Sequence, residues 1–169
     1  MIHDSDTLER ALGQSARAGQ RLRLRRFALG CARAVMADRE PSPLWTETVE
    51  LIEARVGGAL VEHEFRRRAA LLECQFPLLV ALTGLRNGDP RAAAALVVSA
   101  ALNEDVLEAA LGASRNERLH ARLLAAAQAA RTSPGRMAGL LVGERVRFRP
   151  DDAVFYCLQR QAVRLETVR

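Results

Sequence analysis

Arginine is the residue type in this sequence with the greatest capacity for specific recognition, because all 25 basic residues are arginine and none is lysine. The guanidinium group presents a planar set of donors that matches a phosphate, and it stays charged at physiological pH. A GC-rich genome would produce the same excess of arginine and alanine codons. The composition therefore permits phosphate or carboxylate binding without establishing either.

The arginines are concentrated in two zones separated by an acidic one. Residues 10–39 contain eight arginines and one acid, and residues 112–149 contain eight arginines and two acids. Residues 40–64 contain six glutamates and one arginine. This separation indicates more than codon bias, and it directs attention to the segments that carry the arginines.

One candidate phosphate-binding row lies in residues 115–130. At 100° per residue, Arg115, Arg118 and Arg122 fall within about 60° of arc on a helix. Such a row could follow successive phosphates, or it could be an ordinary solvated face with Glu117 as an ion-pair partner. The spacing alone leaves both interpretations open.

A second candidate row lies in residues 20–37, where apolar residues recur at spacings of three and four. This periodicity predicts a helix with one buried stripe and with Arg25, Arg26 and Arg33 on the other side. Proteins that bind single strands usually add aromatic stacking platforms, whereas this chain has only five Phe, one Trp and one Tyr. Contact with the phosphate backbone, without base recognition, is therefore the mode of nucleic-acid binding that we predict.

Motifs of several enzyme classes are absent from the sequence. It contains no GxxxxGK[ST], no GxGxxG, no GxSxG and no HExxH. His3, His63 and His120 are scattered singly, and acid pairs such as Asp151 and Asp152 stand where helix N-termini favour negative charge. We predict a protein that is not an enzyme and that has no cofactor and no metal site.

The elements that must position the arginines are predicted to be helices. Isoleucine occurs only twice, and no stretch alternates apolar and polar residues long enough to predict a strand. We therefore expect an all-α fold of two small packed helical bundles, residues 1–111 and 112–169. The expected helices are residues 5–18, 20–37, 45–56, 60–85, 91–111, 115–130, 134–142 and 150–166.

Local signals mark some helix ends. Pro77 is expected to kink or split the helix over residues 60–85. Ser133 followed by Pro134 predicts a helix start, and the acids of "RPDD" predict the start of the last helix. Apolar positions on these helices are expected to form the core: Leu24, Phe27, Cys31, Leu78, Leu79, Leu82, Leu119, Leu123, Leu141 and Phe155.

The cellular context predicted from the sequence is the cytoplasm. Cys31, Cys74 and Cys157 are far apart and odd in number, which favours reduced thiols that act as small core residues. The acidic start "MIHDSDTLER" does not have the pattern of a signal peptide, and the apolar run "AAAALVVSAAL" is too short to cross a membrane. We expect no membrane partner.

Several segments follow one another in an order with a known counterpart. They are "RLRLRRF", "AALLECQFPLLVALTGLRNGD", "RNERLHARLLAAAQAAR", "GRMAGLL" and "VRFRPDDAVFYCLQRQ". In this order and spacing the chain resembles the small subunit of the type I-E CRISPR surveillance complex, Cascade, over nearly its whole length. It departs from the family pattern after the "RNER" segment, where Arg131 is the nearest substitute for a usual arginine.

The resemblance implies a non-enzymatic scaffold subunit. Two copies of that subunit pack head to tail, bridge the subunits that carry the crRNA, and line a basic path for the displaced non-target DNA strand. Alone, the protein is expected to be monomeric or weakly associating. The candidate nucleic-acid contacts are Arg21, Arg25, Arg26, Arg33, Arg115, Arg118, Arg122, Arg131 and Arg136. The alternative hypothesis is a helical protein–protein adaptor whose arginines pair with acidic partners and bind no nucleic acid.

Overall fold

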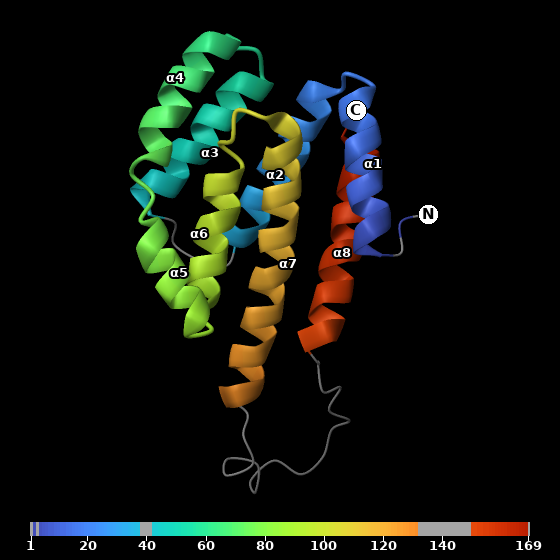
Figure 1. Ribbon diagram of the computed structural model, residues 1–169, viewed down its shortest axis with the longest axis vertical. Helices are drawn as coiled ribbons and strands as arrows, with labels where there is room; N and C mark the ends of the chain where they lie inside the picture. The colour runs from blue at the N-terminus through green and yellow to red at the C-terminus, as the bar shows by residue number, and fades with distance from the viewer. Residues whose placement is uncertain (1, 3, 38–41, 132–149, 169) are drawn as a thin grey trace, which may run out of the picture.

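The computed structural model describes residues 2, 4–37, 42–131 and 150–168. These residues form eight helices and no strand, which confirms the all-α fold (Figure 1). The helices are α1 (Ser5–Arg17), α2 (Arg21–Met36), α3 (Pro43–Val56), α4 (Glu62–Glu73), α5 (Leu78–Arg86), α6 (Pro90–Ala100), α7 (Val106–Arg131) and α8 (Pro150–Thr167).

The longest helix, α7, is the element around which the others pack. It contacts α6, α2, α8 and α1, and Figure 1 shows it running along the middle of the molecule. Small buried residues such as Ala109, Ala110 and Ala113 allow this close packing. At Gly112 a Cβ atom would lie 3.1 Å from the Cβ of Ala100, so the glycine lets α6 and α7 approach.

The α2 helix is covered on more than one side. Leu24, Phe27, Cys31 and Val35 are buried, which confirms the predicted stripe. Because α1, α3, α6, α7 and α8 all contact α2, most of its remaining apolar residues are buried as well. The buried surface of α2 is therefore wider than a single stripe, and it includes Arg25 from the predicted basic side.

The two helices predicted over residues 91–111 and 115–130 are divided at a different point from the one expected. The α6 helix ends at Ala100, and α7 begins at Val106 after a turn in which the Asp105 carboxylate accepts hydrogen bonds from the backbone N–H groups of Leu107 and Glu108. The predicted helix break near Gly112 is therefore wrong. The predicted boundary between two bundles, at residues 111/112, falls inside the continuous helix α7, and one buried core includes residues from both sides of it.

Pro77 separates α4 from α5, as expected, and the two helices are bent by 58°. The predicted burial of the α5 leucines is wrong: Leu78, Leu79 and Leu82 are exposed. This helix instead packs on α6 through small residues, since Ala81 is its one buried residue. The prediction that Cys74 belongs to the core is also wrong, because its thiol lies at the exposed end of α4.

The last helix begins at Pro150 with two acids in its first turn, as predicted. Its buried positions are Cys157, Leu158, Gln161, Ala162 and Leu165. Phe155 is 52% exposed, so its predicted place in the core is wrong.

The remaining core predictions have mixed outcomes. Leu119 and Leu123 of α7 are half-buried. Leu141, the capping pair Ser133 and Pro134, and the predicted helix 134–142 lie outside the described residues.

Candidate nucleic-acid interface

Arg25 is a structural residue, and the prediction that it lies on an exposed face is wrong. Its side chain is buried, and its guanidinium donates hydrogen bonds to the backbone carbonyl oxygens of Ala101, Asn103 and Glu104 at 3.2, 2.7 and 3.4 Å. The guanidinium carbon also lies 4.6 Å from the centre of the Phe65 ring. Burial lowers the pKa of Arg25 to about 10, so the group stays charged at neutral pH.

The contacts of Arg25 have a physical cause in the packing of α2. The α2 helix contacts both α6 and α7, and Arg25 reaches the turn between those two helices. Three carbonyl groups there need donors, and the guanidinium supplies them. Because its side chain is also buried, Arg25 is not accessible to a phosphate from outside.

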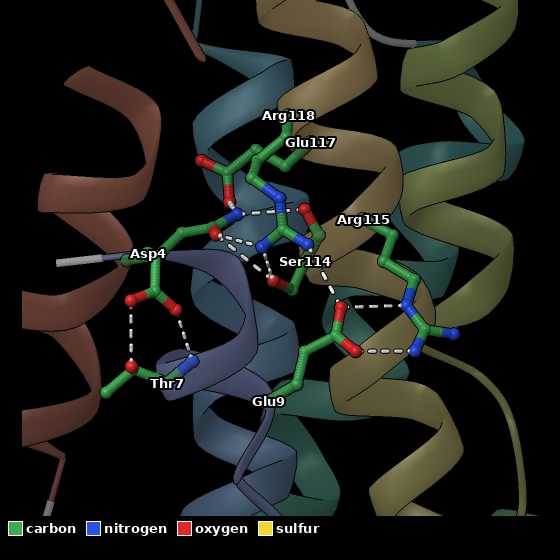
Figure 2. A network of polar contacts seen from close by, with 8 residues as sticks. Asp4, Thr7, Glu9, Ser114, Arg115, Glu117 and Arg118 are labelled. Atoms are coloured by element: carbon green, nitrogen blue, oxygen red, sulfur yellow. Dashed lines mark hydrogen bonds and ion pairs between the residues drawn. The ribbon is translucent and has the colours of Figure 1, made fainter. Parts of the chain in front are cut away.

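Arg118 is also internal, so the predicted exposed row on α7 is broken. Its guanidinium donates to Ser114 Oγ at 2.7 Å, to Gln161 Oε1 at 3.0 Å and to Glu9 Oε1 at 3.2 Å (Figure 2). These partners come from α7 itself, α8 and α1, and the side chain is buried among them. Arg118 joins three helices and does not face solvent.

Glu117 is the centre of the same network, so the alternative in which it is an ion-pair partner on a solvated face does not hold. It is 3% exposed, and its carboxylate accepts hydrogen bonds from Gln161 Nε2 at 2.8 Å and from Arg164 Nη1 at 2.9 Å. Arg164 passes directly over Gly30, where a Cβ atom would lie 2.4 Å from the Arg164 Cδ. A glycine at this point of α2 gives the arginine its path to Glu117.

Two further predicted contacts are exposed but already paired. Arg115 binds Glu9 through Nε at 2.9 Å and Nη2 at 2.6 Å (Figure 2). Arg33 binds Glu53, with Nε at 2.9 Å from Oε1. Exposed ion pairs are weak, so either arginine could exchange its partner, but each would leave a carboxylate beside an incoming phosphate.

The structure brings three arginines together at the beginning of α2. Arg21, Arg23 and Arg26 line a cavity of about 610 Å³. Arg23 was missed from the sequence, although it stands in the same "RLRLRR" run; it donates to the Leu165 carbonyl oxygen at 2.7 Å and so links this cluster to the end of α8. We call Arg21, Arg23 and Arg26 the α2 cluster.

The α2 cluster stands at a helix start that has no acid of its own. The first turn of α2 contains no acid, and Gln20 makes no side-chain capping hydrogen bond there. Positive side chains near a helix N-terminus are unfavourable, whereas an anion there is favourable. Glu166 is the one acid that lines the cavity.

Arg122 and Arg131 are exposed on the second half of α7. At 1.5 Å per residue, Arg131 lies about 24 Å along the helix from Arg115. Arg136 lies outside the described residues. Among the predicted contacts within the described residues, two belong to the α2 cluster, two are exposed on the second half of α7, two are exposed but paired with carboxylates, and two are internal: Arg21 and Arg26, Arg122 and Arg131, Arg33 and Arg115, and Arg25 and Arg118, respectively.

The buried thiols have no reactive character. Burial raises the pKa of Cys157 to about 12 and raises the pKa of Cys31 well above its ordinary value. Both groups stay protonated, as small core residues do.

Within the described ranges, no group of three or more His, Cys, Asp or Glu side chains could hold a metal ion. None of the described helices is by itself long and apolar enough to cross a membrane, and the pair α4 and α5, which passes the length and composition test together, is bent.

Glu9 should make stability depend on pH. Hydrogen bonds from Arg115, followed by the charges of Arg115 and Arg118, lower the pKa of Glu9 below 4.5 in spite of partial burial. A carboxylate with a lowered pKa stabilises the folded state above its unfolded pKa, and this contribution is lost as the pH falls through the folded pKa. Glu9→Gln should therefore destabilise most near pH 7, and the difference from wild type should shrink towards about pH 3.

Urea unfolding of both proteins across this pH range measures that difference. Glu108→Gln, which changes an exposed acid on α7, is the control and should show a smaller pH-dependent difference. A constant difference for Glu9→Gln at all pH values would show that Glu9 acts through packing and not through its charge.

No family model, curated protein or solved structure matches this chain. The fold and the site together define an all-α protein in which the exposed Arg21 and the half-buried Arg23 and Arg26 line one cavity, and in which Glu117 and Arg164 form a buried ion pair.

Proposed function

We propose that this chain is the non-catalytic small subunit of a CRISPR RNA-guided surveillance complex of the Cascade type. In this role it joins the subunits that carry the crRNA, lies beside a second copy of itself and holds the displaced non-target DNA strand. The order of motifs along the chain and the all-α fold support the proposal. The α2 cluster is the observation that carries its nucleic-acid part.

The α2 cluster suits a phosphate backbone for three reasons. Its guanidinium groups are close enough to line one cavity, and guanidinium is the side chain that matches phosphate geometry best. The adjoining helix start has no acid to compete for them. Arg23 is held in place by the Leu165 carbonyl, so part of the cluster is already ordered before a ligand arrives.

The test is binding to fluorescein-labelled single-stranded DNA, measured by anisotropy at several salt concentrations. Each phosphate contact contributes roughly 0.7 to the slope of log K against log salt on a single strand. Arg21→Ala with Arg26→Ala should therefore weaken binding about equally for all sequences and lower the slope by about 1.4. Arg122→Ala with Arg131→Ala tests the second half of α7 in the same way.

The matched control is Arg86→Ala with Arg91→Ala, which removes the same charge from exposed positions on α5 and α6. Circular dichroism checks that each variant is folded, because Arg26 makes a contact within the chain. If the control lowers the slope as much as the α2 variant, binding depends on net charge and the α2 cluster is not a site. If wild type binds no strand at all, the nucleic-acid function is wrong.

The second candidate function is a helical protein–protein adaptor that binds no nucleic acid. It is favoured by two observations: Arg25 and Arg118 pair internally, and α5 exposes large apolar side chains to solvent. An adaptor would show no salt-dependent strand binding, so the same titration separates the two functions.

A further inference from the structure

The outward side of α4 and α5 exposes large apolar side chains in a continuous part of the sequence. We call this surface the α5 face; it comprises Leu71, Leu78, Leu79, Val80 and Leu82, bordered by Arg67, Arg68 and Arg86. Leu79 is 81% exposed and Val80 is 69% exposed, values far from those of a core residue. In Figure 1, α4 and α5 follow each other along one edge of the molecule.

An amphipathic helix in a monomer usually buries its large apolar residues, whereas α5 exposes most of them and buries small ones. Four of its large residues are exposed, while Ala81 is buried and Gly84 lies so close to α6 that a Cβ would be 2.8 Å from the Ala92 Cβ. Small residues thus hold the helix against α6. Large apolar side chains that are exposed at neighbouring positions, as here, mark a candidate interaction site.

The border of the α5 face is basic. Arg67 and Arg68 stand one turn before Leu71 on α4, and Arg86 stands one turn after Leu82 on α5. All three are exposed, and none has an ion pair or side-chain hydrogen bond with another described residue. Glu73 is the exposed acid at this end of α4, so positive charge is in excess around the apolar residues.

We infer that the α5 face docks an amphipathic helix of a partner protein, with an apolar stripe bordered by Asp or Glu. The stripe would cover the leucines and the valine, and the carboxylates would meet Arg67, Arg68 and Arg86. Helix-on-helix packing needs side chains at spacings of three and four, and Leu79, Leu82 and Arg86 have this spacing on α5. The inference is independent of strand binding by the α2 cluster.

The apolar and charged parts together favour a protein over other ligands. Nucleic acid would satisfy the arginines but would leave the five apolar side chains in water. An anionic membrane would cover the apolar residues, but interfacial helices usually add aromatic residues, and α5 has none.

The experiment uses the full chain labelled with a fluorophore at Cys74, the one exposed cysteine beside this surface, since Cys31 and Cys157 are buried. The probe is a designed helical peptide of about five turns with leucine on one stripe and glutamate on its borders. A second peptide has lysine in place of every glutamate. The protein should bind the glutamate peptide at least roughly tenfold more tightly than the lysine peptide, and the preference should fall with salt.

Two variants of the protein locate the binding. Leu79→Ser with Leu82→Ser should lower the affinity for the glutamate peptide by roughly tenfold or more, and Arg67→Glu with Arg68→Glu and Arg86→Glu should abolish the preference between peptides. Leu22→Ser, which changes an exposed leucine on α2, is the control and should bind as wild type does. Because all the altered positions are exposed, folding should survive, and circular dichroism checks this.

Four outcomes would overturn the inference. The first is the absence of peptide binding, and the second is equal binding of the two peptides. The third is an equal loss of affinity for the glutamate peptide in Leu22→Ser and in Leu79→Ser with Leu82→Ser. The fourth is that Leu79→Ser abolishes binding to phosphatidylglycerol vesicles or self-association in sedimentation, because the occupant would then be a membrane or a second copy. Loss of strand binding in the α2 variants would leave all these measurements unchanged.

Discussion

Replacing Glu117 by alanine is expected to lower the free energy of unfolding by about 3–5 kcal/mol, the usual cost of removing one partner from a buried ion pair. The carboxylate is 3% exposed and accepts hydrogen bonds from Arg164 and Gln161. Without it, Arg164 keeps its positive charge at a site that water reaches poorly. Urea denaturation at neutral pH measures the change.

The protonation of Arg164 supports this magnitude. Burial lowers the pKa of Arg164, but the hydrogen bonds and charge of Glu117 and the contact with Cys31 raise it above its ordinary value overall. The guanidinium therefore cannot escape the penalty by losing its proton. It also has little freedom to move, because it crosses α2 at Gly30 and lies over the Phe27 ring, with 6.0 Å from the guanidinium carbon to the ring centre.

Glu108→Ala is the control for this prediction, since Glu108 is an exposed acid on the same helix. Its loss should cost less than about 1 kcal/mol, through the helix dipole. Equal effects of the two substitutions would show that Glu117 is solvated and that the network contributes nothing particular to stability.

Arg25→Ala is expected to destabilise the protein by about 2–5 kcal/mol, because it removes a large buried side chain and leaves backbone acceptors unsatisfied. Those acceptors are the carbonyl groups of Ala101, Asn103 and Glu104 at the turn that starts α7. Lysine should rescue only part of the loss, since a single ammonium group cannot reproduce the planar set of donors or its stacking on Phe65.

Arg21→Ala, four positions earlier on α2, is the matched control and should change the unfolding free energy by no more than about 0.5 kcal/mol. If Arg25→Ala changes the unfolding free energy as little as Arg21→Ala does, the Arg25 guanidinium is solvated and Arg25 is again a candidate phosphate contact. If it destabilises as expected, weaker DNA binding by an Arg25 variant measures unfolding and not a lost contact.

Local features of the sequence determined the all-α fold and several of its boundaries. Pro77 cannot continue the hydrogen bonding of α4, so the chain breaks there whatever surrounds it. The acids after Pro150 favour a helix start for reasons that lie within one turn. The spacing of Leu24, Phe27 and Cys31 likewise determines that these residues share a buried face of α2.

The tertiary structure alone decided which arginines remain available to a partner. Helical periodicity says which residues share a face, but it does not say how many faces neighbouring helices cover. Arg25 and Arg118 lie on helices that several other helices contact. Their guanidinium groups therefore donate hydrogen bonds to carbonyl groups and carboxylates from distant parts of the chain.

Periodicity failed for α5 and α7 for the same reason. Leucine-rich α5 lies at an edge of the bundle, where small residues form the contact and large ones face solvent. Gly112 was predicted to lie in a turn, yet it lies within α7, where the absence of a side chain favours close approach to Ala100. In both cases the deciding quantity is the distance to a neighbouring helix, which depends on packing between segments far apart in the sequence.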